Sequence, residues 1–84
     1  MYKVYVLRSL KDSNLYIGHT KDLDKRICEH NKGKVRSTKS RRPFKLIYFE
    51  NISTKSEAYQ REMFLKSGQG RLLLKNILHN LSED

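Results

Sequence analysis

The chain has 84 residues, of which 18 are Lys or Arg and 9 are Asp or Glu, giving a formal net charge of +9. This length suits one small hydrophobic core, and we expect a single domain over residues 1–84. The lone Cys28 excludes an internal disulfide and the usual Cys/His zinc site, which favours a cytoplasmic protein. The sequence contains no long apolar run, so neither a signal peptide nor a membrane span is predicted. The positive charge favours a polyanionic partner, most often nucleic acid.

The first 18 residues are predicted to form a β-hairpin. Residues 2–9 are rich in aromatic and β-branched side chains, and residues 15–18 form a second extended run. Residues 11–14 between them carry the Asp, Ser and Asn of a turn. Tyr5 and Tyr16 lie on the two arms, and they share a face of the hairpin if the loop has an even number of residues.

A helix is predicted to follow the hairpin. Either Thr20 or Asp22 can cap its beginning, and Gly33 is a typical residue just past its end. Leu23 and Ile27 have the spacing of a buried helical stripe.

Arg26 and His30 lie one turn apart on this helix, at the border of the apolar stripe. A His in such a place is more often a partly buried structural residue than a catalyst. The pair nevertheless has the chemistry to line a cleft that receives phosphate.

A basic loop is predicted next, because residues 32–45 contain seven Lys or Arg and no acid. Such a segment suits contact with the phosphates of nucleic acid. Four of its side chains are the candidates for nucleic-acid binding: Arg36, Lys39, Arg41 and Arg42.

The remainder of the chain reads as one strand and two helices. Residues 44–49 form the strongest strand, and a Thr54–Glu57 capping box opens a helix that runs to residue 66 or 67, before Gly68. Residues 71–81 form a last amphipathic helix. The expected fold is therefore α/β (α+β), a small three-stranded antiparallel or mixed sheet flanked by helices, in the order β-β-α-β-α-α.

Glu62 falls inside the apolar arc of the second long helix, which runs from Leu65 through Ala58 to Tyr59. Burying a carboxylate without a partner is costly. Two interpretations remain open: a salt bridge to a nearby Arg, or a ligand for a divalent metal ion.

Four features occur together in an order and at spacings known from one family: Tyr5, the intact Tyr16-Ile17-Gly18, the run Arg26-x-x-x-His30-Asn31-x-Gly33, and Glu62 on a later helix. From Val4 to Lys66 the chain resembles the GIY-YIG nuclease domain. Residues 66–71 resemble the ending of small stand-alone bacterial members related to the UvrC nuclease domain. The first motif reads Lys3-Val4-Tyr5, and His19 stands where repair members often carry Lys.

The resemblance implies a DNA endonuclease that hydrolyses phosphodiesters with one divalent cation, Mg²⁺ or Mn²⁺, in DNA repair or processing. It also implies a role for each candidate: Glu62 binds the metal, Arg26 contacts the scissile phosphate, Tyr5 is the general base or its hydrogen-bonded partner, Tyr16 orients the water or the phosphate, and His30 relays the proton. Whether His19 or His30 assists Tyr5 stays open. A phenol is a poor base at neutral pH unless positive charge stabilises its anion.

The alternative function is a non-catalytic, basic nucleic-acid-binding module. In that case the loop binds phosphates and the tyrosines stack on bases or fill the core. Glu62 discriminates between the two functions, because a carboxylate in a binding cleft would repel phosphate. DNA is the expected partner, RNA stays open, and specificity would come from the loop, a partner protein or a homodimer.

Overall fold

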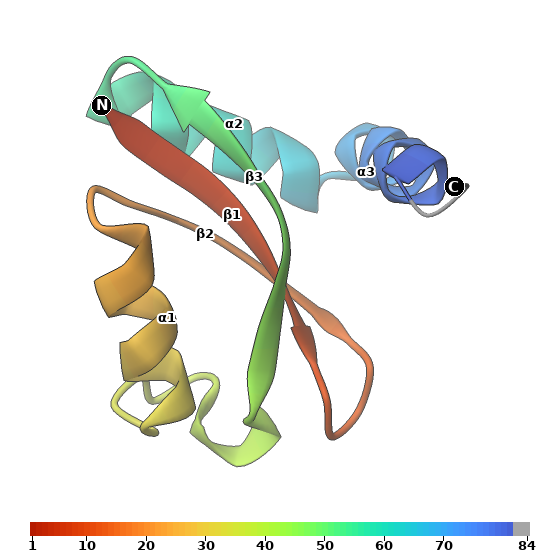
Figure 1. Cartoon of the computed structure of the whole chain (residues 1–84). Helices are drawn as coiled ribbons and strands as arrows, with labels where there is room; N and C mark the ends of the chain where they lie inside the picture. Colours follow the sequence, from red (N-terminus) through yellow and green to blue (C-terminus); the bar gives the residue numbers. More distant parts are fainter. Residues whose placement is uncertain (82–84) are drawn as a thin grey trace.

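The sheet is antiparallel throughout, with β1 in the centre and the strand order β2-β1-β3. A computed structural model describes residues 1–81, and residues 82–84 of the predicted domain lie outside the described residues. The elements are β1 (Tyr2–Ser9), β2 (Leu15–Thr20), α1 (Leu23–Asn31), a 3₁₀-helix (Lys39–Arg41), β3 (Phe44–Ile52), α2 (Lys55–Lys66) and α3 (Gly68–Leu81) (Figure 1). The predicted class and the order β-β-α-β-α-α are confirmed, and the sheet is not mixed.

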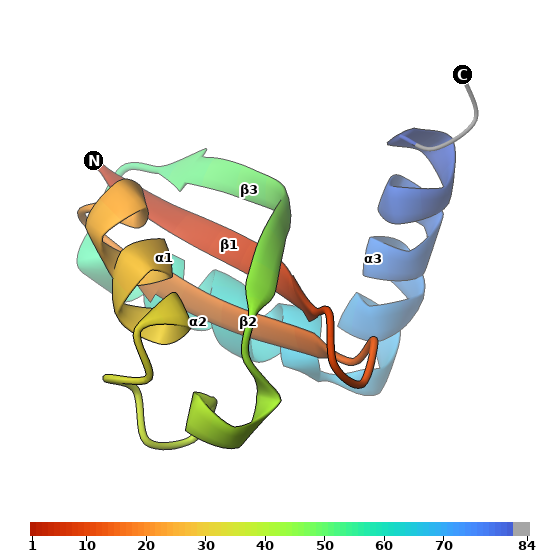
Figure 2. The ribbon, with the colours of Figure 1, turned by 60° about the horizontal axis from the view of Figure 1, so that its bottom comes forward.

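The sheet separates α1 from α2 and α3, and Figure 2 shows α1 in front of the sheet with α2 behind it. Side chains of β1 alternate between these two sides, as a strand requires. Val4 and Val6 pack with residues of α2 and α3, whereas Tyr5 and Leu7 pack with residues of α1. All four are at most 1% exposed. Two small apolar layers therefore stabilise the fold, one on each face of β1.

The ends of α1 follow the sequence closely. Of the two candidate caps, Asp22 is the N-cap, and its carboxylate accepts a hydrogen bond from the backbone N–H of Lys25 at 3.2 Å. Gly33 has a φ of +78°, the left-handed conformation that glycine adopts without strain. The side chain of Asn31 accepts from the N–H of Phe44 at 2.6 Å and donates to its carbonyl at 3.2 Å. These two bonds attach the end of α1 to the beginning of β3.

The last helix begins at Gly68, three residues before the predicted boundary of residue 71. The hydroxyl of Ser67 accepts a hydrogen bond from the N–H of Gly70 at 3.2 Å and so caps the helix. A Cβ on Gly70 would overlap the backbone of Phe64. The predicted start at residue 71 was wrong because Gly70 allows α3 to pack directly on the end of α2, a tertiary contact that helix propensity does not report.

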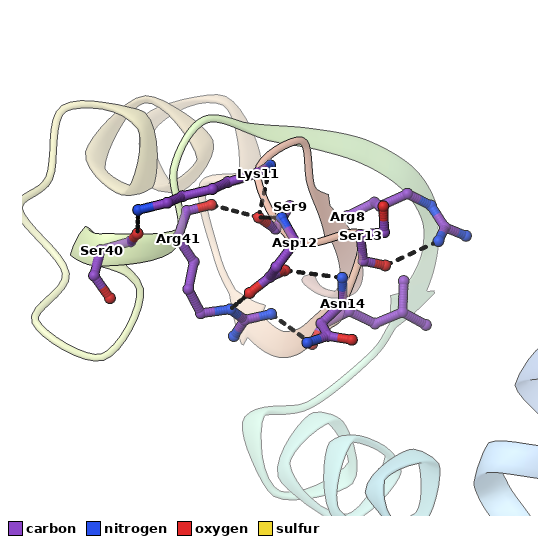
Figure 3. A network of polar contacts seen from close by, with 9 residues as sticks. Arg8, Ser9, Lys11, Asp12, Ser13, Asn14, Ser40 and Arg41 are labelled. Atoms are coloured by element: carbon purple, nitrogen blue, oxygen red, sulfur yellow. Dashed lines mark hydrogen bonds and ion pairs between the residues drawn. The ribbon is translucent and has the colours of Figure 1, made fainter.

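The predicted basic loop is attached to the hairpin turn through a polar network (Figure 3). Ser9 is fully buried, and its hydroxyl donates to the carbonyl of Arg41 at 2.5 Å. The same oxygen accepts from the N–H groups of Lys11 and Asp12, each at 3.1 Å. The guanidinium of Arg41 also binds the carboxylate of Asp12 at 3.1 Å. Part of the loop is therefore a fixed 3₁₀-helix rather than a free segment.

Over residues 1–81, none of the helices has the length and apolar character needed to span a bilayer.

Candidate active site

Tyr5 and Tyr16 lie on the α1 side of the sheet. Tyr16 pairs with Leu7 and Gly18 pairs with Tyr5, so both tyrosines point to the same face. Their ring centroids are 6.3 Å apart. The shared face that the sequence allowed is thus observed. A Cβ on Gly18 would lie 2.6 Å from the Tyr5 hydroxyl, so the glycine lets this hydroxyl rest on the backbone of edge strand β2.

His30 is fully buried and holds the Tyr5 hydroxyl. Its Nε2 lies 3.0 Å from Tyr5 Oη, and its Nδ1 lies 2.8 Å from Thr38 Oγ1. The Thr38 hydroxyl donates to the carbonyl of Val35 at 3.4 Å. The network is satisfied when His30 Nδ1–H donates to Thr38 and Nε2 accepts the proton of Tyr5. Tyr5 is therefore oriented as a donor toward an imidazole that can accept its proton.

Burial keeps both partners of this hydrogen bond neutral. It lowers the pKa of His30 to about 4, with help from the charge of Arg26. It also raises the pKa of Tyr5 to about 12, against the hydrogen bond and charge of Arg26. Moving the Tyr5 proton to His30 in the protein alone is therefore unfavourable. Tyr5 needs added positive charge before it can act as a base.

Arg26 is half-buried beside the tyrosines, as the sequence predicted. Its guanidinium donates to Glu29 at 3.2 Å. Burial lowers the pKa of Arg26, but hydrogen bonds with Tyr5 and Glu29 outweigh this effect and the pKa is raised. The side chain is 36% exposed, so a permanent positive charge faces solvent next to the Tyr5 hydroxyl.

Glu62 lies on the other side of the sheet, where α2 packs on β2. Its Oε1 is 2.6 Å from His19 Nδ1, and its Oε2 is 2.6 Å from Lys66 Nζ. The side chain of Glu62 is 13% exposed. The predicted salt bridge exists, but its cation is Lys66 rather than an Arg. The nearby Arg61 instead binds Glu50 through two hydrogen bonds.

The candidate residues thus form two groups on opposite sides of β2. The Tyr5 hydroxyl lies against Gly18, and His19 is the next residue of the strand. Glu62 contributes to the raised pKa of Tyr5, so its charge reaches the phenol. The edge of β2 is therefore the place where Tyr5, Arg26 and Glu62 can act on one bound group.

A metal at this edge would depend on Glu62. Within the described part of the chain, no cluster of three or more His, Cys, Asp and Glu has the arrangement of a metal site. Mg²⁺ keeps several waters and often takes only one or two carboxylates from a protein. The side chain of Lys66 is 42% exposed, so its ammonium can leave the Glu62 oxygen for solvent. One carboxylate beside an imidazole fits a hydrated divalent cation, and does not fit a fully dehydrated one.

The four basic candidates of the loop differ in their surroundings. Arg36, Lys39 and Arg42 are exposed. Arg41 is half-buried, binds Asp12, and lies over the ring of Phe44 at 5.6 Å. Arg41 therefore stabilises the loop, while the other three present their charges to solvent.

One residue of the site, Thr38, has no role in the sequence-based assignment, and for His19 the sequence raised only assistance to Tyr5, not a contact with Glu62. Thr38 supports His30, and nothing in its polar, irregular segment marks it. His19 binds Glu62. The alternation of β2 could have indicated His19, because residues 18 and 19 of a strand point to opposite faces.

Comparisons with known proteins identify the family. The model of the GIY-YIG catalytic domain matches residues 1–75. A UPF0213 protein of Staphylococcus saprophyticus is 44% identical over 75 residues, which cover 88% of this chain and 90% of that protein. UPF0213 protein YazA of Bacillus subtilis is 49% identical over 63 residues, covering 74% of this chain and 63% of that protein.

A solved structure is also similar. It is the solution NMR structure of UPF0213 protein BH0048 from Bacillus halodurans, with a TM-score of 0.54 and 34% identity. The match covers 92% of this chain and 85% of that one.

Proposed function

Since the chain belongs to the GIY-YIG family, a family of nucleases, we propose that it is a DNA endonuclease that depends on one divalent cation. One observation carries the proposal. The hydroxyl of Tyr5 rests on the backbone of β2 at Gly18, and the charges of Arg26 and Glu62 both act on its pKa. Such an arrangement suits the cleavage of a phosphodiester, which gains negative charge in its transition state.

The residues of the α1 side bind the phosphate and move a proton. Arg26 holds the scissile phosphate with its exposed guanidinium, and Tyr16 orients the phosphate or the attacking water. Tyr5 accepts a proton from that water once its own proton has moved to His30 Nε2. His30, rather than His19, is the group that contacts Tyr5, which supports His30 as the assisting histidine.

The cation would be Mg²⁺ or Mn²⁺ held by Glu62. When bound, it supplies positive charge that polarises the phosphate and lowers the pKa of a nearby phenol. His19 keeps its hydrogen bond to Glu62 Oε1 and so fixes the direction of the carboxylate.

The proposal extends to DNA repair or processing in the cytoplasm. The exposed free thiol of Cys28 supports a reducing compartment. Sequence preference would come from exposed loop cations, from a partner protein or from a homodimer.

The second candidate is the non-catalytic nucleic-acid-binding module. It is favoured by the two short contacts that already occupy both oxygens of Glu62. In this function, Lys66 neutralises the carboxylate, His19 keeps its hydrogen bond to it, and no divalent cation displaces Lys66.

Replacing Glu62 by Gln separates the two functions. Cleavage of labelled duplex, branched and single-stranded DNA is measured with Mg²⁺ or Mn²⁺, and with EDTA as a control. We expect wild type to cut only with the cation and Glu62→Gln not to cut, with DNA binding equal or stronger. The free energy of unfolding should change by less than about 1 kcal/mol, because Lys66 is solvent-exposed.

Glu57→Gln is the matched control, since Glu57 is an exposed carboxylate of the same helix and Gln also serves at this position of a capping box. It should cut like wild type. If Glu62→Gln cuts as well as wild type, Glu62 is not the metal ligand. If wild type cuts none of the substrates, the result favours the binding module.

A further inference from the structure

A groove of about 750 Å³ lies between the hairpin and α3. Its floor is apolar and includes Leu15 and Ile17 of β2 and Leu74 of α3. Such a floor suits the flat faces of bases and sugars better than it suits water.

The polar lining of the groove is strongly basic. Arg8, Lys66, Arg71 and Lys75 line it, and within residues 1–81 no Asp or Glu does. Arg8 donates to the carbonyl of Ser13 at 3.1 Å, and Lys66 binds Glu62. Arg71 and Lys75 are exposed, and neither side chain has an ion pair or hydrogen bond with the described residues. Two free cations at fixed places on one helix are therefore available to an anionic ligand.

The groove meets both groups of the candidate active site. Tyr16, whose ring lies next to His30 and Tyr5, is also part of the groove lining. Lys66 lines the groove and contacts Glu62 as well. A chain lying in the groove would therefore arrive at the edge of β2 beside Glu62, with the Tyr16 ring on the opposite face of the strand.

We infer that this groove binds one strand of nucleic acid, with its phosphates on Arg71 and Lys75 and its bases on the apolar floor. A duplex presents mainly phosphates and has its base faces stacked inside, so the apolar floor favours a single strand. The direction of the strand, toward β2, rests on the proposed function, but the binding itself requires no cleavage.

Binding is tested in EDTA, where a metal-dependent nuclease cannot cut. The probe is a labelled oligothymidylate of about 15 nucleotides, compared with a duplex of equal length. The variant is Arg71→Gln with Lys75→Gln. We expect it to bind the single strand about tenfold or more weakly at 0.1 M salt, and to reduce the slope of log K against log salt by about 1.4. Duplex affinity should fall less.

The control carries Lys25→Gln and Lys55→Gln, which remove the same charge from two exposed side chains outside the groove. It should keep most of the single-strand affinity, and thermal unfolding should show that both double variants are folded. Equal weakening by the two variants would overturn the inference, because charge alone would then explain it. Wild-type protein that fails to bind the single strand would overturn it too. Single-strand binding that depends on Arg71 and Lys75 supports the inference whether or not the protein cuts DNA. A protein that binds in this way but never cuts DNA would contradict only the proposed endonuclease function.

Discussion

His30 is a titratable group that the fold holds neutral, and its burial makes stability depend on pH. Its pKa falls from 6.5 to about 4 on folding, so the native state binds fewer protons than the unfolded state between these values. Stability from this group is fully present above pH 6.5 and is lost as the pH falls toward 4. The loss reaches about 3 kcal/mol. Urea unfolding at pH values from about 7.5 to about 4 measures this loss. The upper limit lies about one unit above the pKa of the unfolded state, and the lower limit equals the pKa of the folded state.

The variant His30→Gln provides the comparison for this pH dependence. It lacks the titrating imidazole, so its stability should fall less over the same range. An equally steep fall in the variant would assign the acid sensitivity to other groups and contradict a neutral, buried His30.

Gly18 is required by a close approach rather than by its backbone conformation. A Cβ there would lie 2.6 Å from Tyr5 Oη and 3.2 Å from the Tyr16 ring. Gly18→Ala should displace both phenols, cost about 1–3 kcal/mol in stability, and abolish cleavage. Gly68→Ala is the control, because a Cβ on Gly68 meets nothing within 4 Å. It should leave cleavage intact and raise stability by up to about 1 kcal/mol. Equal cleavage by both variants would show that the Tyr5 position does not matter.

At the scale of elements, the hydroxyl of Ser9 connects the hairpin turn to the 3₁₀-helix. It donates to one carbonyl and accepts from two N–H groups in a fully buried place. Ser9→Ala leaves these groups unpaired and should cost about 1–3 kcal/mol. Faster hydrogen exchange at residues 39–41 should accompany the loss. Ser40→Ala removes an exposed hydroxyl and should change neither quantity. Similar exchange in the two variants would mean that Ser9 does not hold the loop.

Elements defined by local chemistry were predictable from the sequence. The hairpin, the Asp22 and Thr54 caps and the stop at Gly33 are all present. The start of α3 was not predictable, because it depends on the contact of Gly70 with the end of α2. The boundary of a helix or strand is predictable when residues close in the sequence determine it. It is not predictable when it depends on packing against the end of another helix.

The candidate site was predictable only in part, for a similar reason. The positions of Tyr5, Arg26 and His30 follow from one hairpin and one helix. The position of Glu62 requires the register of β2 and the packing of α2, neither of which a single helix reveals. The sequence indicated that Glu62 needs a cation, but not that His19 and Lys66 supply its contacts. The contact of Thr38 with His30 was likewise not predictable, since only the folded loop brings the two side chains together.

At the scale of the whole molecule, the net charge of +9 is spread over surfaces with different roles. Changing the exposed Arg36, Lys39 and Arg42 to Gln should weaken binding to all duplex sequences alike. It should flatten the salt slope by about 0.9 for each phosphate that the variant no longer neutralises. Arg41→Gln should instead lower stability, because Arg41 binds Asp12 and covers Phe44. Fluorescence anisotropy over a salt series and thermal unfolding measure the two effects. An unchanged slope in the triple variant would place duplex binding elsewhere.

The endonuclease itself is tested most directly through the hydroxyl of Tyr5. Tyr5→Phe keeps the buried ring and removes only the oxygen that contacts His30. Cleavage of labelled DNA is measured under single-turnover conditions with Mg²⁺, and binding of the same DNA is measured in EDTA. We predict that the variant binds like wild type and cuts at least about 100-fold more slowly. Cutting at the wild-type rate by Tyr5→Phe would contradict the proposed site.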